Sequence, residues 1–185
     1  SAFNSDGFTV VDAGMTNESG HTYVAWNWKG GGSASSNSNG SITSSVSANT
    51  TAGFSIITYT GTGSQTTVGH GLGKAPKVVI TKLRDTTTQD WFFMTGEIMS
   101  DRRKYIKFND DGGIATDAHT YPNVAPTSTV YTIGGDDGGN GSNGNGYGYV
   151  AYCWSEIPGY SRFGLYTANG NQDALPMFTK VTSSP

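Results

Sequence analysis

The chain is poor in charge, in cysteine and in long apolar runs, and each shortage excludes a class of protein. Only 14% of the 185 residues are charged, the formal net charge is −3, and no run of Lys and Arg is present that would bind phosphate. We therefore expect no nucleic-acid partner. The single cysteine, Cys153, cannot form an internal disulfide and is best explained as a small buried apolar residue. No apolar run has the length of a membrane-spanning helix, so we expect no membrane insertion.

Helical periodicity is also missing, whereas glycine and aromatic residues are plentiful. The chain has 27 glycines and 12% aromatic residues, and short runs of β-branched and aromatic residues alternate with Gly, Asn and Asp corners. Strands are predicted at 8–11, 23–28, 54–60, 66–68, 76–82, 91–94, 104–108, 129–133 and 147–154, with a further one opening at 163–166. This spacing predicts an all-β fold, an antiparallel β-sandwich or jelly roll with Gly-rich loops.

A short phrase occurs twice in the chain. GHTYVAWNW at 20–28 is echoed by GYGYVAYCW at 146–154, and Trp26 matches Tyr152 where the aromatic residue differs. Each copy follows a predicted strand and a glycine-bearing loop. We therefore divide the chain into four parts: the closing hairpin of a preceding unit at 1–29, a Gly/Ser/Asn-rich linker or arm at 30–52, a complete sandwich unit at 53–161, and the start of a further unit with a polar tail at 162–185.

A closing hairpin without its own sandwich leaves strand edges and an apolar face exposed, so it must pack on something. It could fold back onto the central unit, or it could complete the sandwich of a neighbouring molecule, which repeated head to tail builds a filament. We therefore expect a homo-oligomer or filament held by the repeated aromatic residues. These assembly candidates are Tyr23, Trp26, Trp28, Tyr149, Tyr152 and Trp154.

Several phrases carry a resemblance to a known family. GFSIITYTGTG, TVGHGLGKAPKVVITK and DWFF, followed by YVAYCWSEIPGYSRFGLYTANGNQD, resemble a repeat of marine bacteriophage proteins. Those proteins are large virion or tail-fibre-like chains with concanavalin-like β-sandwich domains. The resemblance covers about residues 53–173, with the echo in 1–29, and the chain departs from the pattern after Asp173. It implies a viral structural protein of a fibre, tail or outer shell, located in the virion or outside the cell, that contacts itself or other virion proteins.

Aromatic residues beside polar ones give an alternative function, a receptor-binding, lectin-like module for host-surface glycans. Sugar binding needs an exposed aromatic platform with neighbouring Asn or Asp. Asp90 with Trp91, or Asn145 with Tyr147, offers such a pair. Trp91 could equally be a core residue, because two phenylalanines follow it and one face of that strand must point inwards.

Catalytic patterns are missing from the sequence. No G-x-S-x-G is present, the three histidines stand apart, and no facing pair of glutamates is recognisable, so we expect no enzyme. Four carboxylates in Gly/Asn-rich loops are candidate ligands for Ca²⁺, the one cofactor that concanavalin-like folds often carry: Asp110, Asp111, Asp136 and Asp137. Ordinary Asx turns explain these residues equally well.

Overall fold

The computed structural model describes residues 2–10, 16–86, 89–95, 98–135 and 141–166 of the chain. These residues form strands and no helix, which confirms the predicted all-β class. Accordingly, the described residues include no helix long and apolar enough to cross a membrane.

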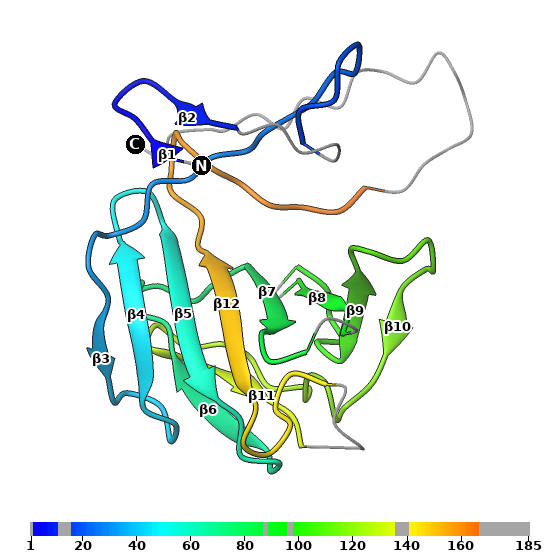
Figure 1. The fold of residues 1–185 in the computed structure, drawn as a ribbon. Coiled ribbons are helices and arrows are strands. Elements are labelled where there is room, and N and C mark those ends of the chain that lie inside the picture. Colours follow the sequence, from blue (N-terminus) through cyan, green and yellow to red (C-terminus); the bar gives the residue numbers. More distant parts are fainter. Residues whose placement is uncertain (1, 11–15, 87–88, 96–97, 136–140, 167–185) are drawn as a thin grey trace.

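Eight strands form one large antiparallel sheet (Figure 1). In spatial order they are β10 (Ala115–Thr116), β9 (Lys104–Lys107), β8 (Trp91–Met94), β7 (Val78–Leu83), β12 (Gly148–Trp154), β5 (Phe54–Thr60), β4 (Ser44–Asn49) and β3 (Ser35–Asn37). β12 pairs over its whole length with β5 and over most of it with β7. The last strand of the described residues therefore lies in the interior of the sheet.

A second, smaller sheet covers one face of the large one. It consists of β6 (Thr66–Gly69) and β11 (Val130–Ile133), and Ile42 forms a bridge with Val68 beside it. Alternate residues of the large sheet point towards this layer and form the core with it: Val46, Ile57, Tyr59, Val79, Leu83, Phe92, Met94, Tyr149, Ala151 and Cys153 from the large sheet, with Val68, Tyr131 and Ile133 from the small one. The two layers make a β-sandwich.

The Gly/Ser/Asn-rich stretch at 30–52, which was predicted as a linker or arm, lies along the sandwich and contributes strands to it. It contains β3 and β4, and β4 pairs with β5 along five residues. Ile42 and Val46 are buried, and the Ser44 hydroxyl donates a hydrogen bond to the carbonyl of Gly69 in the small sheet at 3.0 Å. Two apolar side chains are enough to hold this stretch because β5 supplies the hydrogen-bond ladder, and composition alone does not reveal that neighbour.

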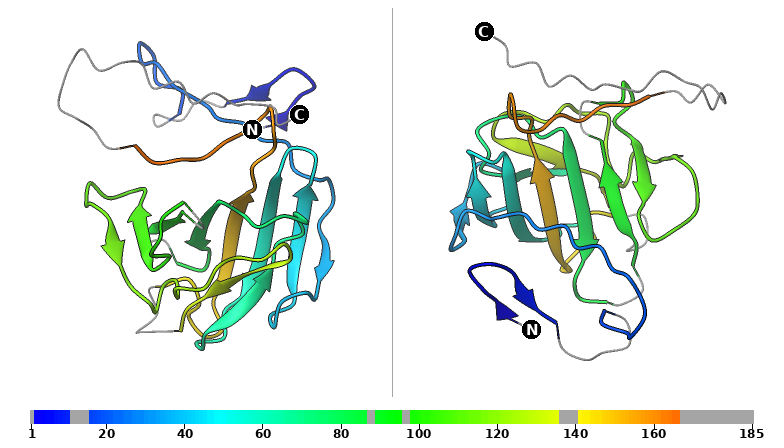
Figure 2. Two further views of the ribbon diagram at one scale, coloured as in Figure 1. Left: turned by 180° about the vertical axis from the view of Figure 1, so that it is seen from behind. Right: turned by 90° about the horizontal axis from the view of Figure 1, so that it is seen from above.

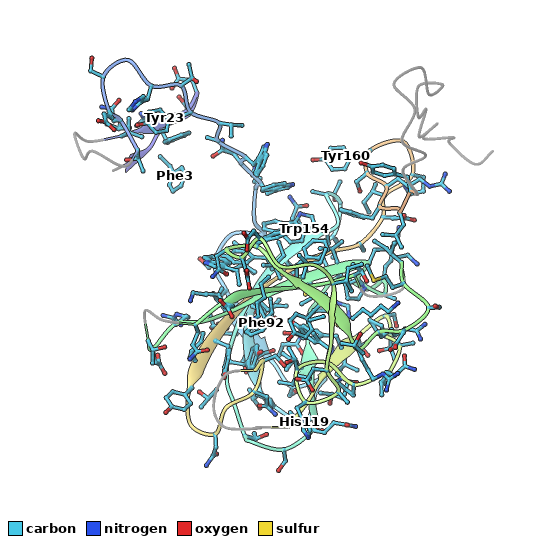
Figure 3. All side chains as sticks on the ribbon, turned by 90° about the vertical axis from the view of Figure 1, so that its right-hand side faces the viewer. Phe3, Tyr23, Phe92, His119, Trp154 and Tyr160 are labelled. Atoms are coloured by element: carbon cyan, nitrogen blue, oxygen red, sulfur yellow. The ribbon has the colours of Figure 1, made fainter. Side chains whose placement is uncertain are left out.

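The N-terminal segment, residues 2–10 and 16–31, also differs from prediction. β1 (Ala2–Phe3) pairs with β2 (Phe8–Thr9), so the strand predicted at 8–11 is present in part. Residues 23–28 and 163–166 form no strand. β12 has a strand on each side, whereas no described strand pairs with residues 23–28, and a strand needs such a partner. Figure 3 shows Phe3 and Tyr23 standing clear of the sandwich, with Phe92 inside it.

The buried Asn143 ties the loop between β5 and β6 to the loop between β11 and β12 at one end of the sandwich. Its Nδ2 donates to the carbonyl oxygens of Ser64 at 2.6 Å and Gly134 at 2.8 Å, and its Oδ1 accepts from the amide of Thr62 at 2.8 Å. These partners lie before β6, after β11 and after β5. One amide side chain therefore satisfies backbone groups that belong to both sheets.

We expect Asn143→Ala to lower the free energy of unfolding by about 2–4 kcal/mol, because it leaves two carbonyls and one amide without this partner. Urea unfolding followed by circular dichroism measures the change. Asn145→Ala, in the same loop but exposed, is the matched control and should change stability by less than about 0.5 kcal/mol. Equal effects of the two substitutions would contradict the role of Asn143.

His70 supports the Gly69-His70-Gly71 corner as a neutral ring. It is fully buried, its Nδ1 accepts the amide hydrogen of Leu72 at 3.2 Å, and its Nε2 donates to the carbonyl of Thr127 at 3.2 Å. One accepting and one donating nitrogen define the neutral tautomer. Burial lowers the pKa of His70 and outweighs the hydrogen bond to Thr127, which raises it.

This lowered pKa makes stability depend on pH. The neutral ring is favoured in the folded state, so the contribution of His70 is complete above the unfolded pKa of about 6.5 and is lost as pH falls through the lowered folded pKa. The pKa values of Asp90 and Asp117 are also lowered, from about 3.8, so those carboxylates lose their contributions at more acidic pH.

We expect the wild-type protein to lose stability between pH 7.5 and pH 5, and His70→Gln to lose less over that interval, because glutamine does not titrate. Urea unfolding at the two pH values gives both slopes. Val68→Ala, at a buried residue that does not titrate, should lower stability at both pH values and keep the wild-type slope. A wild-type slope in His70→Gln would show that other groups cause the loss.

Candidate functional site: the outer face of the large sheet

The large sheet has a second face, directed away from the small sheet, which we call the outer face. Directly paired residues of neighbouring strands point to the same face, so the register defines rows across it. The central row crosses five strands and is apolar throughout: Ile56, Tyr152, Ile80, Phe93 and Ile106. One flanking row contains Phe54, Trp154 and Val78. The other contains Thr58, Val150, Lys82 and Trp91.

An apolar outer face is unusual for an antiparallel sheet, whose solvent-facing side is normally polar. The five residues of the central row are all half-buried rather than covered. Lys82 is the one charged residue in the three rows, and its Nζ donates to the carbonyl of Gln89. Contiguous exposed apolar surface of this kind marks an interaction site on a protein.

The N-terminal segment reaches the outer face through Trp28. Its ring centroid lies 5.4 Å from that of Trp154 at an interplanar angle of 72°, and 6.2 Å from that of Phe54. Phe54 and Trp154 are themselves 5.0 Å apart. Trp28 and Trp154 are the final residues of the two copies of the repeated phrase, so the two copies are in contact within one chain.

Backbone contacts hold the next residues beside β4. The backbone carbonyl of Lys29 accepts from the side-chain Nδ2 of Asn49 at 3.2 Å, and the backbone amide of Gly31 donates to Ser47 Oγ at 3.0 Å. Gly31 approaches β4 so closely that a Cβ there would lie 1.9 Å from the carbonyl oxygen of Ala48. The chain can follow this path only with glycine at that position.

Between the N-terminal segment and the outer face lies a pocket of about 440 Å³. Trp26, Trp28, Tyr152 and Trp154 contribute to its lining, together with apolar residues of the segment and of β5. Trp26 remains 77% exposed. Figure 2 shows the blue N-terminal segment running along one side of the large sheet, and Figure 3 shows Trp154 at the end of the sandwich nearest to it.

The six assembly candidates therefore separate into three groups. Trp28, Tyr152 and Trp154 meet on the outer face, whereas Tyr23 and Trp26 lie exposed on the N-terminal segment. Tyr149 points the other way. It is fully buried, its ring stacks on Tyr59 with centroids 5.2 Å apart, and its hydroxyl accepts from a backbone amide at 2.6 Å. Tyr149 is therefore a core residue with no exposed surface in this structure.

The glycan candidates Asp90 and Trp91 lie at the start of β8 but point to different sides of the sheet. Trp91 is on the outer face, is 37% exposed and stacks on Tyr152 with centroids 6.4 Å apart. The Asp90 carboxylate accepts from Lys107 Nζ and from Asn109 Nδ2, both at 2.8 Å, and Lys107 pairs with the core residue Phe92. The hydrogen bond from Lys107, followed by that from Asn109, lowers the pKa of Asp90. The register therefore places this ionised carboxylate on the side of Phe92, away from the outer face.

The remaining candidates lie elsewhere. Asn145 and Tyr147 are exposed in the loop before β12, a different element from the one that carries Trp91. Asp110 Oδ1 accepts the Gly112 amide at 3.0 Å, which is an Asx turn, and Asp111 is exposed. Asp136 and Asp137 lie outside the described residues. Within the described part of the chain, no three His, Cys, Asp or Glu side chains are grouped so that they could hold a metal.

Sequence reasoning missed the central row, apart from Tyr152. The signal was present in the continuous apolar runs Val78-Val79-Ile80 and Trp91-Phe92-Phe93-Met94. A strand with one solvent-facing side alternates apolar and polar residues, whereas apolar residues at successive positions indicate that both sides are covered. The two runs therefore indicate strands that are apolar on both faces, one of which is the outer face.

Comparison with known proteins adds one relationship. Searches of curated proteins and of solved structures found no significant match to the chain. A family model described as Domain of unknown function (DUF7483) matches residues 1–181. The match includes the N-terminal segment and the residues that follow the sandwich as well as the sandwich itself. On this evidence the chain belongs to the DUF7483 family.

Proposed function

We propose that this protein is a non-catalytic building block of a larger assembly and that it contacts further copies of itself through the outer face. The observation that carries the proposal is the uncharged central row, Ile56-Tyr152-Ile80-Phe93-Ile106, which is half-exposed across five strands. Burial of apolar surface is the main driving force of protein association. A second copy offers an equally uncharged row, whereas a highly charged partner would bury unpaired charges against this face.

The size of the face fits this role. The three rows hold twelve residues, and with strands about 4.8 Å apart and rows about 6.8 Å apart they cover roughly 400 Å². A stable interface buries about 800 Å² on each partner. The exposed aromatic residues of the N-terminal segment adjoin the patch and enlarge it towards that value. Two outer faces can then pack as sandwich layers about 10 Å apart.

The resemblance to marine phage virion proteins supports a setting for such a building block. A fibre, tail or outer shell is assembled from many copies or repeated units, and its β-sandwich subunits work by packing and by exchange of strands or hairpins. In that setting the protein lies in the virion or outside the cell, contacts itself or other virion proteins and needs no cofactor.

We expect Ile80→Lys to weaken self-association by about tenfold or more, because it places a charge in the centre of the apolar row. Light scattering behind size-exclusion chromatography, over a concentration series, measures the association. Ser45→Lys is the matched control, since Ser45 is exposed on β4 at the polar margin of the same face. A wild-type chain that stays monomeric at the highest concentration, or equal association of all three proteins, would contradict the proposal.

Glycan binding is a second candidate function, favoured by the contacts at the start of β8. The Trp91 ring is exposed, and Asn109 holds both neighbouring residues: its Oδ1 accepts from the Trp91 backbone amide at 2.8 Å and its Nδ2 donates to the Asp90 carboxylate. Sugar recognition needs a fixed aromatic ring for the apolar face of the sugar and hydrogen-bonding groups near the edge of that ring.

If this site binds glycans, Trp91→Ala should abolish retention on a glycan array, while Phe108→Ala should not. Phe108 is 57% exposed in the turn directly after β9 and packs against Phe93, so it controls for the loss of an exposed ring. Repeating the array with calcium and with a chelator tests the carboxylates Asp110, Asp111, Asp136 and Asp137. A wild-type protein that retains no glycan, or equal loss in both variants, excludes a specific site at Trp91.

A further inference from the structure

We propose that residues 16–31 are exchanged between two copies of the chain, so that Trp28 of one copy packs on Phe54 and Trp154 of the other. This inference rests on the proposed assembly function, because its partner is a second copy, and it names the contact that joins the copies. The exchange would make each outer face the acceptor for a neighbour's N-terminal segment.

The complementarity needed for exchange is already visible within one chain. Trp28 lies 5.4 Å from Trp154 and 6.2 Å from Phe54, ring centroid to ring centroid. Because a second copy carries the same two acceptor rings, the contact made between chains is chemically identical to the contact made within one. Exchange of an identical element is a low-cost route to association for this reason.

Apart from the Trp28 ring contacts, the segment is held to its own chain by the hydrogen bonds of Lys29 with Asn49 Nδ2 and of Gly31 with Ser47 Oγ, which a second copy also offers. Trp28 itself is 48% exposed, and the residues before it are more so, with Tyr23 at 51%, Val24 at 73% and Trp26 at 77%. No described strand pairs with residues 23–28. Leaving the parent chain therefore breaks few contacts, whereas a second molecule can cover apolar side chains that the parent leaves in water.

A suitable hinge follows the segment directly. Residues 32–34 are exposed and connect the closely held Gly31 to β3. Gly32 has φ +92°, and as a glycine it can take other conformations once the hydrogen bond from Ser47 Oγ to its carbonyl, at 2.7 Å, is broken. Three residues span about 10 Å when extended. β3 is the edge strand of the sheet, where a second copy can approach closely enough for so short a hinge.

A pair of positions reports directly on which chain the segment contacts. A Cβ on Gly30 would lie 3.2 Å from Ser47 Oγ, a separation that suits a disulfide. Cys153 is buried and does not compete. The double variant Gly30→Cys/Ser47→Cys should therefore form the 30–47 disulfide within one chain when it is oxidised at low concentration, which verifies the contact itself.

The test mixes two single variants, Gly30→Cys and Ser47→Cys, at high concentration before oxidation. Neither variant can form the 30–47 disulfide alone, so this bond in the mixture requires a segment seated on another chain. We expect a species of twice the 19.4 kDa chain mass that carries the 30–47 linkage in peptide mapping, and its loss when Trp28→Ala is added to the Gly30→Cys chain.

Each other outcome has a definite meaning. Copies that associate, with sensitivity to Ile80→Lys but without the 30–47 linkage, would overturn the exchange and leave the outer-face proposal standing. A mixture that neither associates nor links would overturn both. A double variant that does not link even within one chain would remove the contact between Gly30 and β4 on which the exchange depends.

Discussion

The simultaneous pairing of β12 with β5 and β7 is the interaction on which the rest of the structure depends. Through it one strand joins the two halves of the eight-stranded sheet. Its alternate side chains also serve both faces, with Tyr149, Ala151 and Cys153 in the core and Val150, Tyr152 and Trp154 on the outer face. The core and the candidate site are therefore two sides of the same strand, and a change in its register would move every one of these residues to the opposite side.

The outer face and the N-terminal segment are two apolar surfaces that adjoin each other. The sheet provides an apolar surface that a single copy leaves half in water, and the segment provides aromatic residues that a single copy leaves largely in water. Trp28 connects the two within the chain by ring contacts to Phe54 and Trp154. Because the DUF7483 match spans the segment as well as the sandwich, the segment belongs to what the family model describes.

The sequence was sufficient for the fold class and for most central strands, because glycine corners and β-branched runs act locally. The burial of Cys153 was also predicted, and burial raises the pKa of its thiol. The predictions failed where a long-range partner decides the outcome. Residues 44–49 form a strand because β5 lies beside them. Residues 23–28 form none, since no described strand pairs with them. The echo of the two phrases indicated a relationship but not that their final tryptophans touch.

The interior position of β12 has a consequence for how the chain is made. β5 and β7 are synthesised long before β12, so the slot between them stays empty while the intervening residues leave the ribosome. A product that stops short of Gly148 would carry two unpaired strand edges in its centre, the kind of exposed surface through which nascent chains aggregate. Only when Trp154 has emerged can the sheet become continuous, so the two halves of this sheet are joined in a single late step of its synthesis.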